Sequence, residues 1–292
     1  MAFKIIVCAK QVPDTNVIKI NPKTGTLIRD GVPSILNNDD ANALEEALKI
    51  KDKFDDVHIT VISMGPPQAN DLLFECIAKG ADEGILVSDR AVGGSDTWAT
   101  SNTLEAAVRK WVKDNGDYDL IFTGRQAIDG DTAQVGPQVA EKLGLPQVTY
   151  AEEILDVKDG KITIRRRLES GVETVKAPLP CVVTVNGTAA ECRPRNARRV
   201  MKFKRAASPS EKAKLSEAQQ AMVDANPDLQ LKEWGAAFVE ADPAQIGLAG
   251  SPTKVKAIEN VVFSAKENLV LENNDEQIEN LIKTLIANHT IG

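Results

Sequence analysis

The stretch HITVISMGPPQANDLLFECIAKGADEGILVS at residues 58–88 decides the fold class of this 292-residue chain. Its two ends, 58–64 and 84–88, are short apolar runs rich in Val, Ile and Leu, as expected of strands buried on both faces. The residues between them, 67–80, carry a helical pattern. A strand, a helix and a second strand in this order form a βαβ unit, whose two strands lie parallel in one sheet.

Further strand and helix patterns flank this unit on both sides. They are the apolar runs at 3–9, 119–124, 179–187 and 261–263 and the helical patterns at 40–54, 96–114 and 131–144. Apolar residues at helical spacing, as in 40–54, lay one face of a helix on a sheet. We therefore predict an α/β fold with a mostly parallel, twisted sheet and helices on both faces. Segments 17–30 and 161–178 alternate around turns and are predicted to form additional β-hairpins.

The character of the chain changes in its last third. RPRNARRVMKFKR at 193–205 is rich in basic residues and has no acidic one, and 206–230 is polar and rich in alanine. DEQIENLIKTLIANH at 275–289 has the pattern of an amphipathic helix. We predict an α/β domain over residues 1–200, then a basic and polar linker and a C-terminal arm over 201–292 that packs on a partner subunit. The basic stretch is predicted to be a docking surface.

Composition and charge exclude several classes of protein. Hydrophobic residues make up 42% and charged residues 26% of the chain, as in globular proteins. No run of about 18 apolar residues is present, so no membrane-spanning helix is expected, and the first residues lack the apolar core of a signal peptide. The net charge of −7 argues against nucleic acid as a partner. Four cysteines without a C-x-x-C pair and two histidines argue against a disulfide framework or a metal site and favour a cytoplasmic protein.

Four loops follow the carboxyl ends of the predicted parallel strands, where open α/β sheets bind their ligands. These loops are AKQVPD at 9–14, SMGPP at 63–67, SDRAVGGSD at 88–96 and TGRQAIDGDTAQ at 123–134. Most of them lead into a helix, and the free N–H groups of a helix N-terminus suit an anion such as phosphate. Glycine and aspartate in any single loop are also ordinary turn and cap residues. Two long glycine-rich loops on one edge of one sheet nevertheless favour a nucleotide.

Known phosphate-binding motifs narrow the choice. Neither G-x-G-x-x-G after the first strand nor G-x-x-x-x-G-K-[ST] occurs, which excludes the ordinary dinucleotide fingerprint and the P-loop NTPases. VGGSDT at 92–97 resembles the S-G-G-x-D-S loop of ATP pyrophosphatases, although it follows the third parallel run rather than the first. An ATP-pyrophosphatase-like enzyme is therefore an alternative, which release of AMP and pyrophosphate from ATP would reveal.

Asp129 and Asp131 stand close together in the last of these loops and suggest metal binding or acid–base chemistry. A structural interpretation is stronger, because Asp131 is placed to cap the following helix and Asp129 to lie in a turn. Asp96 is likewise placed as the N-cap of the helix after the glycine-rich loop. We therefore predict neither a catalytic acid or base nor a metal ligand.

Five segments, in order along the chain, resemble the beta (small) subunit of electron transfer flavoproteins over nearly the whole sequence. The most specific is TGRQAIDGDTAQVGPQVAEKLGLP at 123–146, and the others are KIIVCAKQVPD at 4–14, NNDDANALEEAL at 37–48, ISMGPPQANDLLFECIAKGAD at 62–82 and LAGSPTKV at 248–255. The resemblance implies an α/β fold of the adenine-nucleotide-binding type. It also implies a heterodimer with an alpha (large) subunit that carries a redox-active FAD. One departure concerns docking to a dehydrogenase, because Ala197 stands where the family's partner-recognition loop presents a leucine.

In this family the small subunit holds either AMP or, in electron-bifurcating members, a second FAD. The loop SDRAVGGSDTWATS at 88–101 resembles the bifurcating pattern, in which S-D-R is followed by G-x-D-T and A-T-S. The resemblance thus implies a redox-active electron-transfer subunit whose FAD accepts hydride from NAD(H) and supplies the chemistry. Electrons would pass to an acyl-CoA-type or other dehydrogenase and to ferredoxin or flavodoxin. An AMP-binding structural subunit without its own flavin is the alternative.

Carried over residue by residue, the resemblance implies a cofactor site in three parts. The adenosine pocket is expected to use Cys8, Ala9, Asn38, Asp39, Asp40 and Met64. The phosphates are expected on the backbone of the loop that contains Gly124, Arg125, Gln126, Ile128, Gly130, Asp131, Thr132, Ala133, Gln134 and Val135, with Thr132 at the helix start. The riboflavin part is expected beside Asp96, Thr97 and Thr100, where small side chains leave space for the isoalloxazine.

Overall fold

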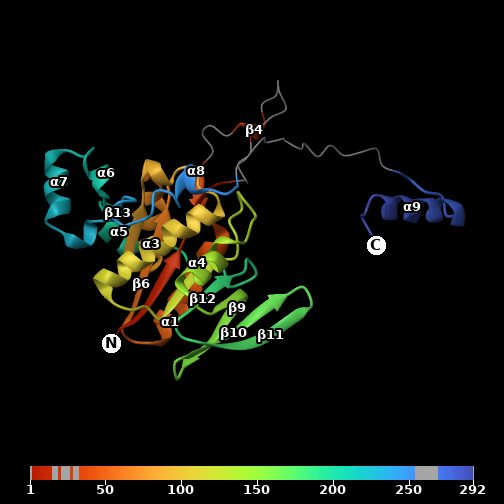
Figure 1. Cartoon of the computed structure of the whole chain (residues 1–292), viewed down its shortest axis with the longest axis horizontal. Helices are drawn as coiled ribbons and strands as arrows, with labels where there is room; N and C mark the ends of the chain where they lie inside the picture. The colour runs from red at the N-terminus through yellow and green to blue at the C-terminus, as the bar shows by residue number, and fades with distance from the viewer. Residues whose placement is uncertain (1, 15–18, 21–26, 29–32, 254–268, 292) are drawn as a thin grey trace. The chain divides into compact units, whose positions relative to one another are not determined.

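The computed structural model describes residues 2–14, 19–20, 27–28, 33–253 and 269–291 (Figure 1). By their internal contacts the residues group into two units. The larger unit comprises Met1–Ile18 and Arg29–Lys256, and the smaller comprises Lys19–Ile28 and Ala257–Gly292.

The larger unit is built on a nine-stranded sheet with the strand order β11-β10-β9-β12-β8-β1-β6-β7-β13. Its strands are β1 (Phe3–Cys8), β6 (Val57–Met64), β7 (Glu83–Val87), β8 (Leu120–Gly124), β9 (Gln147–Lys158), β10 (Lys161–Leu168), β11 (Gly171–Pro178), β12 (Cys181–Val185) and β13 (Lys232–Trp234). All neighbours from β9 to β13 along this order are parallel, whereas β9, β10 and β11 pair antiparallel. The predicted mostly parallel sheet is confirmed.

Helices α1 (Asn38–Lys53) and α2 (Asn70–Lys79) cover one face of this sheet, and α3 (Thr97–Asn115) and α4 (Val135–Leu143) cover the other. The larger unit also contains α5 (Ala197–Phe203), α6 (Pro209–Lys212), α7 (Glu217–Asp224) and α8 (Gly247–Gly250), with short 3₁₀ turns η1 (Pro67–Ala69), η2 (Arg90–Val92) and η3 (Pro227–Leu229). In β1, Ile5 and Val7 pack in the core under α1 and α2, whereas Ile6 and Cys8 pack in the core under α3 and α4. Both faces of the strand are therefore buried, which explains its unbroken apolar sequence.

The chain enters the sheet in its middle and reverses direction beside β1. From β1 the chain proceeds through α1 to β6 and then to β7, and α3 returns it to β8 on the other side of β1. A point where the strand order reverses in this way leaves a crevice at the carboxyl ends of the strands. The topology therefore brings the loops after β1, β6, β7 and β8 to one edge.

The antiparallel end of the sheet was predicted in part. The hairpin of β10 and β11 is confirmed and extends from the sheet (Figure 1), but β9 was not anticipated. The sequence of β9 contains Glu152, which is only 7% exposed. Its buried carboxylate is stabilised because it accepts hydrogen bonds from Arg167 and Thr188. Buried Glu46 of α1 accepts the N–H of Ile154 at 2.9 Å. Glu152 and the other polar residues of β9 break the apolar pattern by which such a strand is recognised.

Shorter hairpins lie outside the large sheet. β2 (Gln11–Pro13) pairs with β5 (Ser34–Leu36), and in the smaller unit β3 (Lys19–Ile20) pairs with β4 (Leu27–Ile28). The hairpin predicted at 17–30 is thus confirmed for the residues of β3 and β4. The strand predicted at 261–263 lies outside the described residues.

The larger unit continues past residue 200, where the α/β domain was predicted to end. Phe203, Val223, Leu229 and Leu231 are buried in one cluster with Ile77 of α2. β13 then adds a parallel strand beside β7. The sequence did not indicate either feature, because both depend on contacts with residues more than a hundred positions away.

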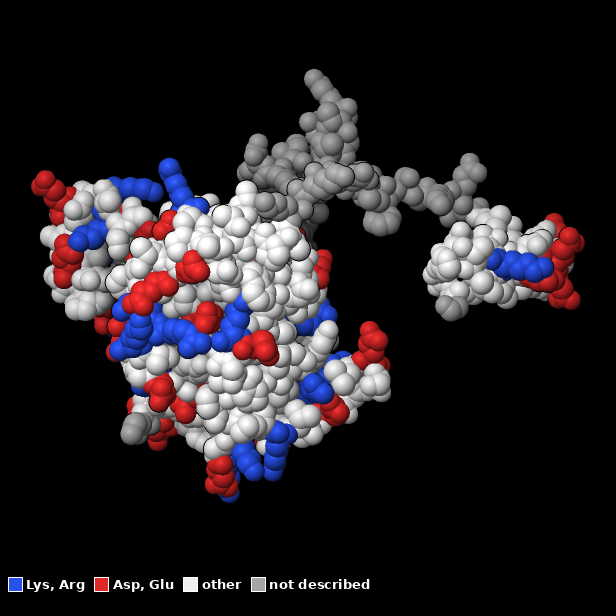
Figure 2. Space-filling view, in the orientation of Figure 1, with Lys and Arg blue, Asp and Glu red and all other residues white. Residues whose placement is uncertain are grey.

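Part of the basic stretch at 193–205 has a structural role. Arg193 binds Glu45 at 2.9 Å and Asp52 at 2.7 Å, and the guanidinium of Arg199 donates to the carbonyl of Ile77 at the end of α2. On the face shown in Figure 2, basic and acidic side chains of the larger unit lie side by side. Docking of a partner on the remaining basic side chains stays a prediction.

The smaller unit ends in the helix α9 (Asp275–Ala287). Asn274 caps this helix, because its side chain accepts the N–H of Gln277 at 2.9 Å. The amphipathic helix predicted at 275–289 is therefore confirmed. Across the described segments of both units, we find no helix with the length and apolar character that a bilayer crossing requires.

Candidate functional site

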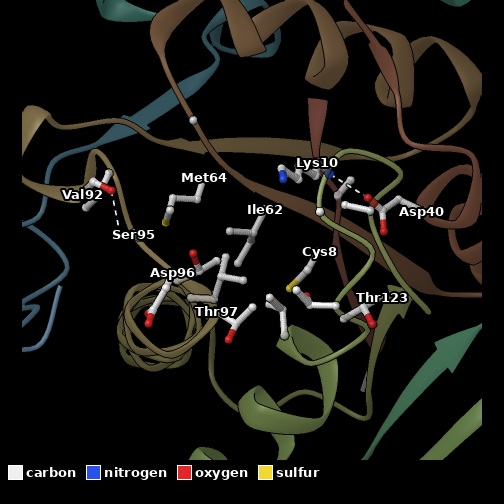
Figure 3. Close-up of a pocket in the computed structure, with 18 of the residues that line it drawn as sticks. Cys8, Lys10, Asp40, Ile62, Met64, Val92, Ser95, Asp96, Thr97 and Thr123 are labelled. Atoms are coloured by element: carbon white, nitrogen blue, oxygen red, sulfur yellow. Dashed lines mark hydrogen bonds between the residues drawn. The ribbon is translucent and has the colours of Figure 1, made fainter. Parts of the chain in front are cut away.

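A cavity of about 1070 Å³ opens at the carboxyl ends of β1, β6, β7 and β8, beside the point where the strand order reverses (Figure 3). This volume is slightly above the roughly 300–1,000 Å³ that small-molecule and cofactor sites occupy. Its wall contains most of the predicted site residues: Cys8, Ala9, Asp40, Met64, Asp96, Thr97, Thr100, Gly124, Arg125, Gln126, Gly130, Asp131, Thr132, Ala133, Gln134 and Val135.

Three predicted site residues do not line this cavity. Asn38 is exposed at the start of α1, and Asp39, 8% exposed, has its Oδ2 atom 3.6 Å from the Nε atom of Arg125. Burial raises the pKa of Asp39, and the Arg125 guanidinium opposes this effect. The N–H of Ile128 donates to the side chain of Asn37 at 3.2 Å. The role of Asn38, Asp39 and Ile128 in binding a cofactor stays a prediction.

Asp40 joins the loop after β1 to the loop after β8. Its carboxylate accepts the N–H of Lys10 at 2.8 Å and the N–H of Gly124 at 2.8 Å, so one side chain of α1 ties the end of β1 to the end of β8. Burial raises the pKa of Asp40 to about 7. Asn37, fully buried beside it, donates to the carbonyl of Gln126 at 2.8 Å. The N-terminus of α1 therefore determines where the loop after β8 begins.

The predicted helix start in the loop after β8 is wrong. The helix α4 begins at Val135 with Gln134 as its N-cap residue, so Asp131 does not cap it and Thr132 does not start it. Asp131 and Ala133 instead have φ of +50° and +52°, in the left-handed region. Turns of this kind direct successive backbone N–H groups toward one side and form concavities that bind anions.

The glycine-rich loop after β7 carries the opposite end of the cavity wall. Asp96 is confirmed as the N-cap of α3, because its Oδ1 atom accepts the N–H of Ala99 at 3.0 Å. Its Oδ2 atom accepts both the N–H of Thr253 at 2.9 Å and the hydroxyl of Thr253 at 2.6 Å. Although burial opposes it, these hydrogen bonds hold the pKa of Asp96 below its usual range. The carboxylate is therefore anionic and already bound by the protein itself.

Apart from buried Asp40, whose carboxylate accepts two backbone N–H groups, the cavity contains little that suggests acid–base or metal chemistry. Burial raises the pKa of Cys8 to about 12, so its sulfur is a thiol rather than a nucleophilic thiolate. Among the residues that the structure describes, no group of three or more His, Cys, Asp and Glu side chains is arranged to hold a metal ion. The arrangement suits binding and orientation of a ligand that brings its own chemistry.

Several charged residues of the wall were not anticipated from the sequence. Lys10, Arg90 and Glu233 line the cavity, and the ammonium of Lys10 contacts the Asp129 carboxylate at 2.7 Å. Lys10 follows β1 directly, so its place in the quoted loop at 9–14 was a usable signal. Glu233 lies in β13, and no sequence pattern indicated that this short strand pairs with β7.

Most of the chain, including the loops of the cavity after β6, β7 and β8, matches a known protein family. Residues 24–221 match the family model described as the electron transfer flavoprotein domain. The chain belongs to the electron transfer flavoprotein family. It is 44% identical to the electron transfer flavoprotein subunit beta of Megasphaera elsdenii over 99% of this chain and 100% of that protein. The corresponding beta subunit of Clostridium acetobutylicum is 47% identical over 87% of this chain and 86% of its own length.

Two further relatives of this electron transfer flavoprotein carry other names. Subunit CarD of the caffeyl-CoA reductase-Etf complex of Acetobacterium woodii is 59% identical over 62% of this chain and 68% of that protein. Protein FixA of Azotobacter vinelandii is 40% identical over 97% of this chain and 92% of that protein. Members of the family bind flavin or AMP, and a beta subunit implies an alpha subunit as its partner. The resemblance read from the five sequence segments is therefore confirmed at the level of family and subunit type.

Proposed function

We propose that this chain is the small subunit of an electron-bifurcating electron transfer flavoprotein and that its cavity holds a second FAD. The observation that carries the proposal is one continuous cavity that reaches from Cys8 at the end of β1 and Asp40 at the start of α1 to Thr97 and Thr100 on α3. AMP would occupy only the part beside β1 and the loop after β8. The remaining space beside the glycine-rich loop suits the riboflavin part of a dinucleotide.

The backbone of the wall fits the phosphate groups of such a cofactor. α4 begins at the cavity, and its N-cap residue Gln134 makes no side-chain hydrogen bond to the first turn. Free N–H groups at a helix N-terminus bind phosphate, and the helix dipole adds to the attraction. The left-handed residues Asp131 and Ala133 precede this helix and add a turn that suits an anion. Lys10 and Arg125 provide positive charge on the same side.

Part of the wall beyond the phosphates consists of small residues. Gly93, Gly94, Ser95 and Thr100 line it, alongside the larger Met64, Arg90 and Leu104. When bound, FAD supplies the redox chemistry, accepting a hydride from NADH and releasing its electrons separately to two acceptors. The chain's own residues bind and orient the cofactor. The hydroxyl of Thr97 is held by Gln134 and Gln138 of α4 at 3.2 and 3.4 Å, which joins the two helices across this end.

The relatives support the bifurcating type without naming this chain's reaction. One of them is named as a subunit of a complex that contains caffeyl-CoA reductase, and others are named protein FixA. For this chain we propose an acyl-CoA-type or other dehydrogenase as one electron acceptor and ferredoxin or flavodoxin as the other. A cytoplasmic location is part of the same proposal.

The deciding experiment is a flavin and nucleotide count of the purified complex with the alpha subunit. We expect two FAD per heterodimer, no AMP, and reduction of both flavins by NADH. One FAD and one AMP per heterodimer would overturn the proposal and establish the AMP-binding alternative.

A substitution in the part of the cavity proposed for the riboflavin group tests the assignment of that part. Thr100→Phe should fill the space beyond the phosphates, so that the second FAD is lost while AMP still binds. Thr103→Val is the matched control, because Thr103 is buried one turn further along α3 and does not line the cavity. Substitution of Gly124 is a poor test, since an added Cβ would lie 2.4 Å from Oδ1 of Asp40 and would displace α1. Equal FAD retention by Thr100→Phe and Thr103→Val would contradict the assignment of this end.

A further inference from the structure

A segment from late in the chain lies directly on the glycine-rich loop. The N–H of Leu248 donates to the carbonyl of Gly93 at 3.1 Å, and the N–H of Gly247 donates to the hydroxyl of Ser95 at 3.1 Å. The hydroxyl of Ser251 accepts the N–H of Asp96 at 2.9 Å. With the two bonds from Thr253 to Asp96, residues 247–253 bind the last part of this loop, residues 93–96. We call these residues the latch segment.

The latch segment approaches the loop as closely as a backbone permits. Gly247 has a φ of +62°, and a Cβ atom added to it would lie 2.0 Å from the carbonyl oxygen of Ala91. Only glycine avoids this overlap and adopts this φ without strain. Ser251 is 5% exposed and also donates to the carbonyl of Gly247 at 2.7 Å, which closes the latch segment on itself.

The loop has little other support. In the part of the chain that the structure describes, the hydrogen bonds that Gly93, Ser95 and Asp96 make outside their own loop and α3 all go to the latch segment. The preceding residue Asp89 is fixed separately, by the N–H of Ala236 at 3.0 Å. The position of residues 93–96 therefore depends on the latch segment rather than on the sheet.

We propose that Ser251 and Thr253 are positioning residues that hold the glycine-rich loop back from the cavity and so keep open the space for the part of a dinucleotide beyond its adenosine phosphate. The inference rests on the proposed function in taking this cavity as the cofactor site. It adds that these two residues help to decide whether the cavity binds a dinucleotide or a mononucleotide. Neither residue lines the cavity, so both act through Asp96 and its loop.

Variants of Thr253 test the latch segment most directly. Thr253→Val keeps the volume and the backbone N–H of this residue but removes the hydroxyl that donates to the Asp96 carboxylate, and Thr253→Ser keeps the hydroxyl. Ser251→Ala removes the acceptor of the Asp96 N–H. Thr103→Val is the control. It also removes a threonine hydroxyl that donates a hydrogen bond, here to the carbonyl of Ala99 at 3.0 Å within α3, and this bond does not involve the latch segment. Asp96→Asn is unsuitable, since it alters the helix cap as well.

Two quantities are measured on the complex with the alpha subunit. The first is hydrogen exchange of the amides of residues 90–99, and the second is the release rate of the second FAD beside the affinity for AMP. In Thr253→Val and Ser251→Ala we expect faster exchange. FAD release should be about tenfold faster in Thr253→Val, the loss expected for one hydrogen bond to a charged group, and about threefold faster in Ser251→Ala, where the lost bond involves a neutral N–H. AMP affinity should be unchanged, Thr253→Ser should restore wild-type behaviour, and Thr103→Val should show neither effect.

The outcomes separate this inference from the proposed function. Unchanged hydrogen exchange in Thr253→Val and Ser251→Ala would overturn the latch. Faster exchange with equal losses of FAD and AMP would overturn its role in selecting a dinucleotide. A wild-type complex without a second FAD would refute the proposed function instead, and the exchange measurement would then decide alone whether the latch segment holds the loop.

Discussion

Lys10 reaches from the end of β1 to the loop after β8. Its backbone N–H is held by buried Asp40, and its ammonium contacts both oxygens of Asp129 at 2.7 and 2.8 Å. Its side chain is 49% exposed, so the ion pair itself stabilises the fold by about 1 kcal/mol or less. A phosphate group bound on the neighbouring backbone would compete with Asp129 for this cation.

Lys10→Met should therefore weaken nucleotide retention. We expect release from the complex about fivefold faster, corresponding to about 1 kcal/mol for a partly exposed charge contact, with a smaller difference at high salt. Release rates after rapid dilution measure the effect. Asp129→Asn is the control, because it frees Lys10 for the phosphate and should not speed release. Equal losses in the two variants would mean that Lys10 acts only by holding the loop.

Asp40 makes stability depend on pH. Burial raises its pKa in the folded chain from 3.8 to about 7, so the folded chain holds this proton more tightly than the unfolded chain. The resulting stabilisation is present below about pH 4 and is lost as the pH rises to about 7. We expect Asp40→Asn to lack this loss, so its melting temperature relative to wild type should rise between about pH 4 and about pH 7. A constant difference across this range would contradict the raised pKa.

At the scale of elements, the start of α4 depends on close contact with two strands. A Cβ atom added to Gly136 would lie 2.6 Å from Oγ1 of Thr123 on β8 and 2.8 Å from Cγ2 of Thr184 on β12. Glycine thus lets the first turn of α4 lie against the sheet, next to the cavity.

Gly136→Ala should push α4 away from the sheet. We expect a loss of about 1–3 kcal/mol in the free energy of unfolding, typical of overpacking, together with weaker nucleotide binding. Denaturant unfolding and nucleotide content of the complex measure the two effects. Thr123→Ala in the same chain removes one of the clashing atoms and should recover part of the loss. Gly144→Ala is not a matched control, because Gly144 has a φ of +68° and serves as the C-cap of α4.

At the scale of the whole molecule, α9 presents an apolar face that no described residue covers. Ile278, Ile282 and Ile286 are 41, 44 and 52% exposed and recur four positions apart on this face. An exposed apolar stripe of this kind suits a contact with a partner. The family implies an alpha subunit as a partner, and we predict that α9 packs on it.

Ile282→Glu should therefore weaken assembly of the heterodimer. We expect less alpha subunit to co-purify with the chain, since a charge on this face would lose its water on binding. Lys283→Ala is the control, because Lys283 pairs with Glu279 and its side chain is 67% exposed. A full yield of heterodimer from Ile282→Glu would show that α9 does not carry the contact.

The sequence by itself determined the parallel α/β sheet and the edge on which the cavity lies. Strands such as β1 are buried on both faces, so their sequences are unbroken apolar runs. Helices such as α1 bury one face, so their sequences carry apolar residues at helical spacing. Once these elements alternate, the loops after the parallel strands must share one edge. The N-cap role of Asp96 was also readable, because a helix cap depends only on residues a few positions away.

Only the tertiary structure decided how the loops are held around the cavity. Asp40 ties Lys10 to Gly124, and Thr253 binds Asp96 over 157 positions of chain. Such contacts join residues distant in sequence, and a single polar residue gives no sign of its partner. The start of α4 at Val135 was also decided by folding, because Ala133 has a left-handed backbone, which alanine disfavours and which depends on the packed loop. Periodicity records which face of an element is buried, whereas the pairing of one polar group with another is settled only when the chain has folded.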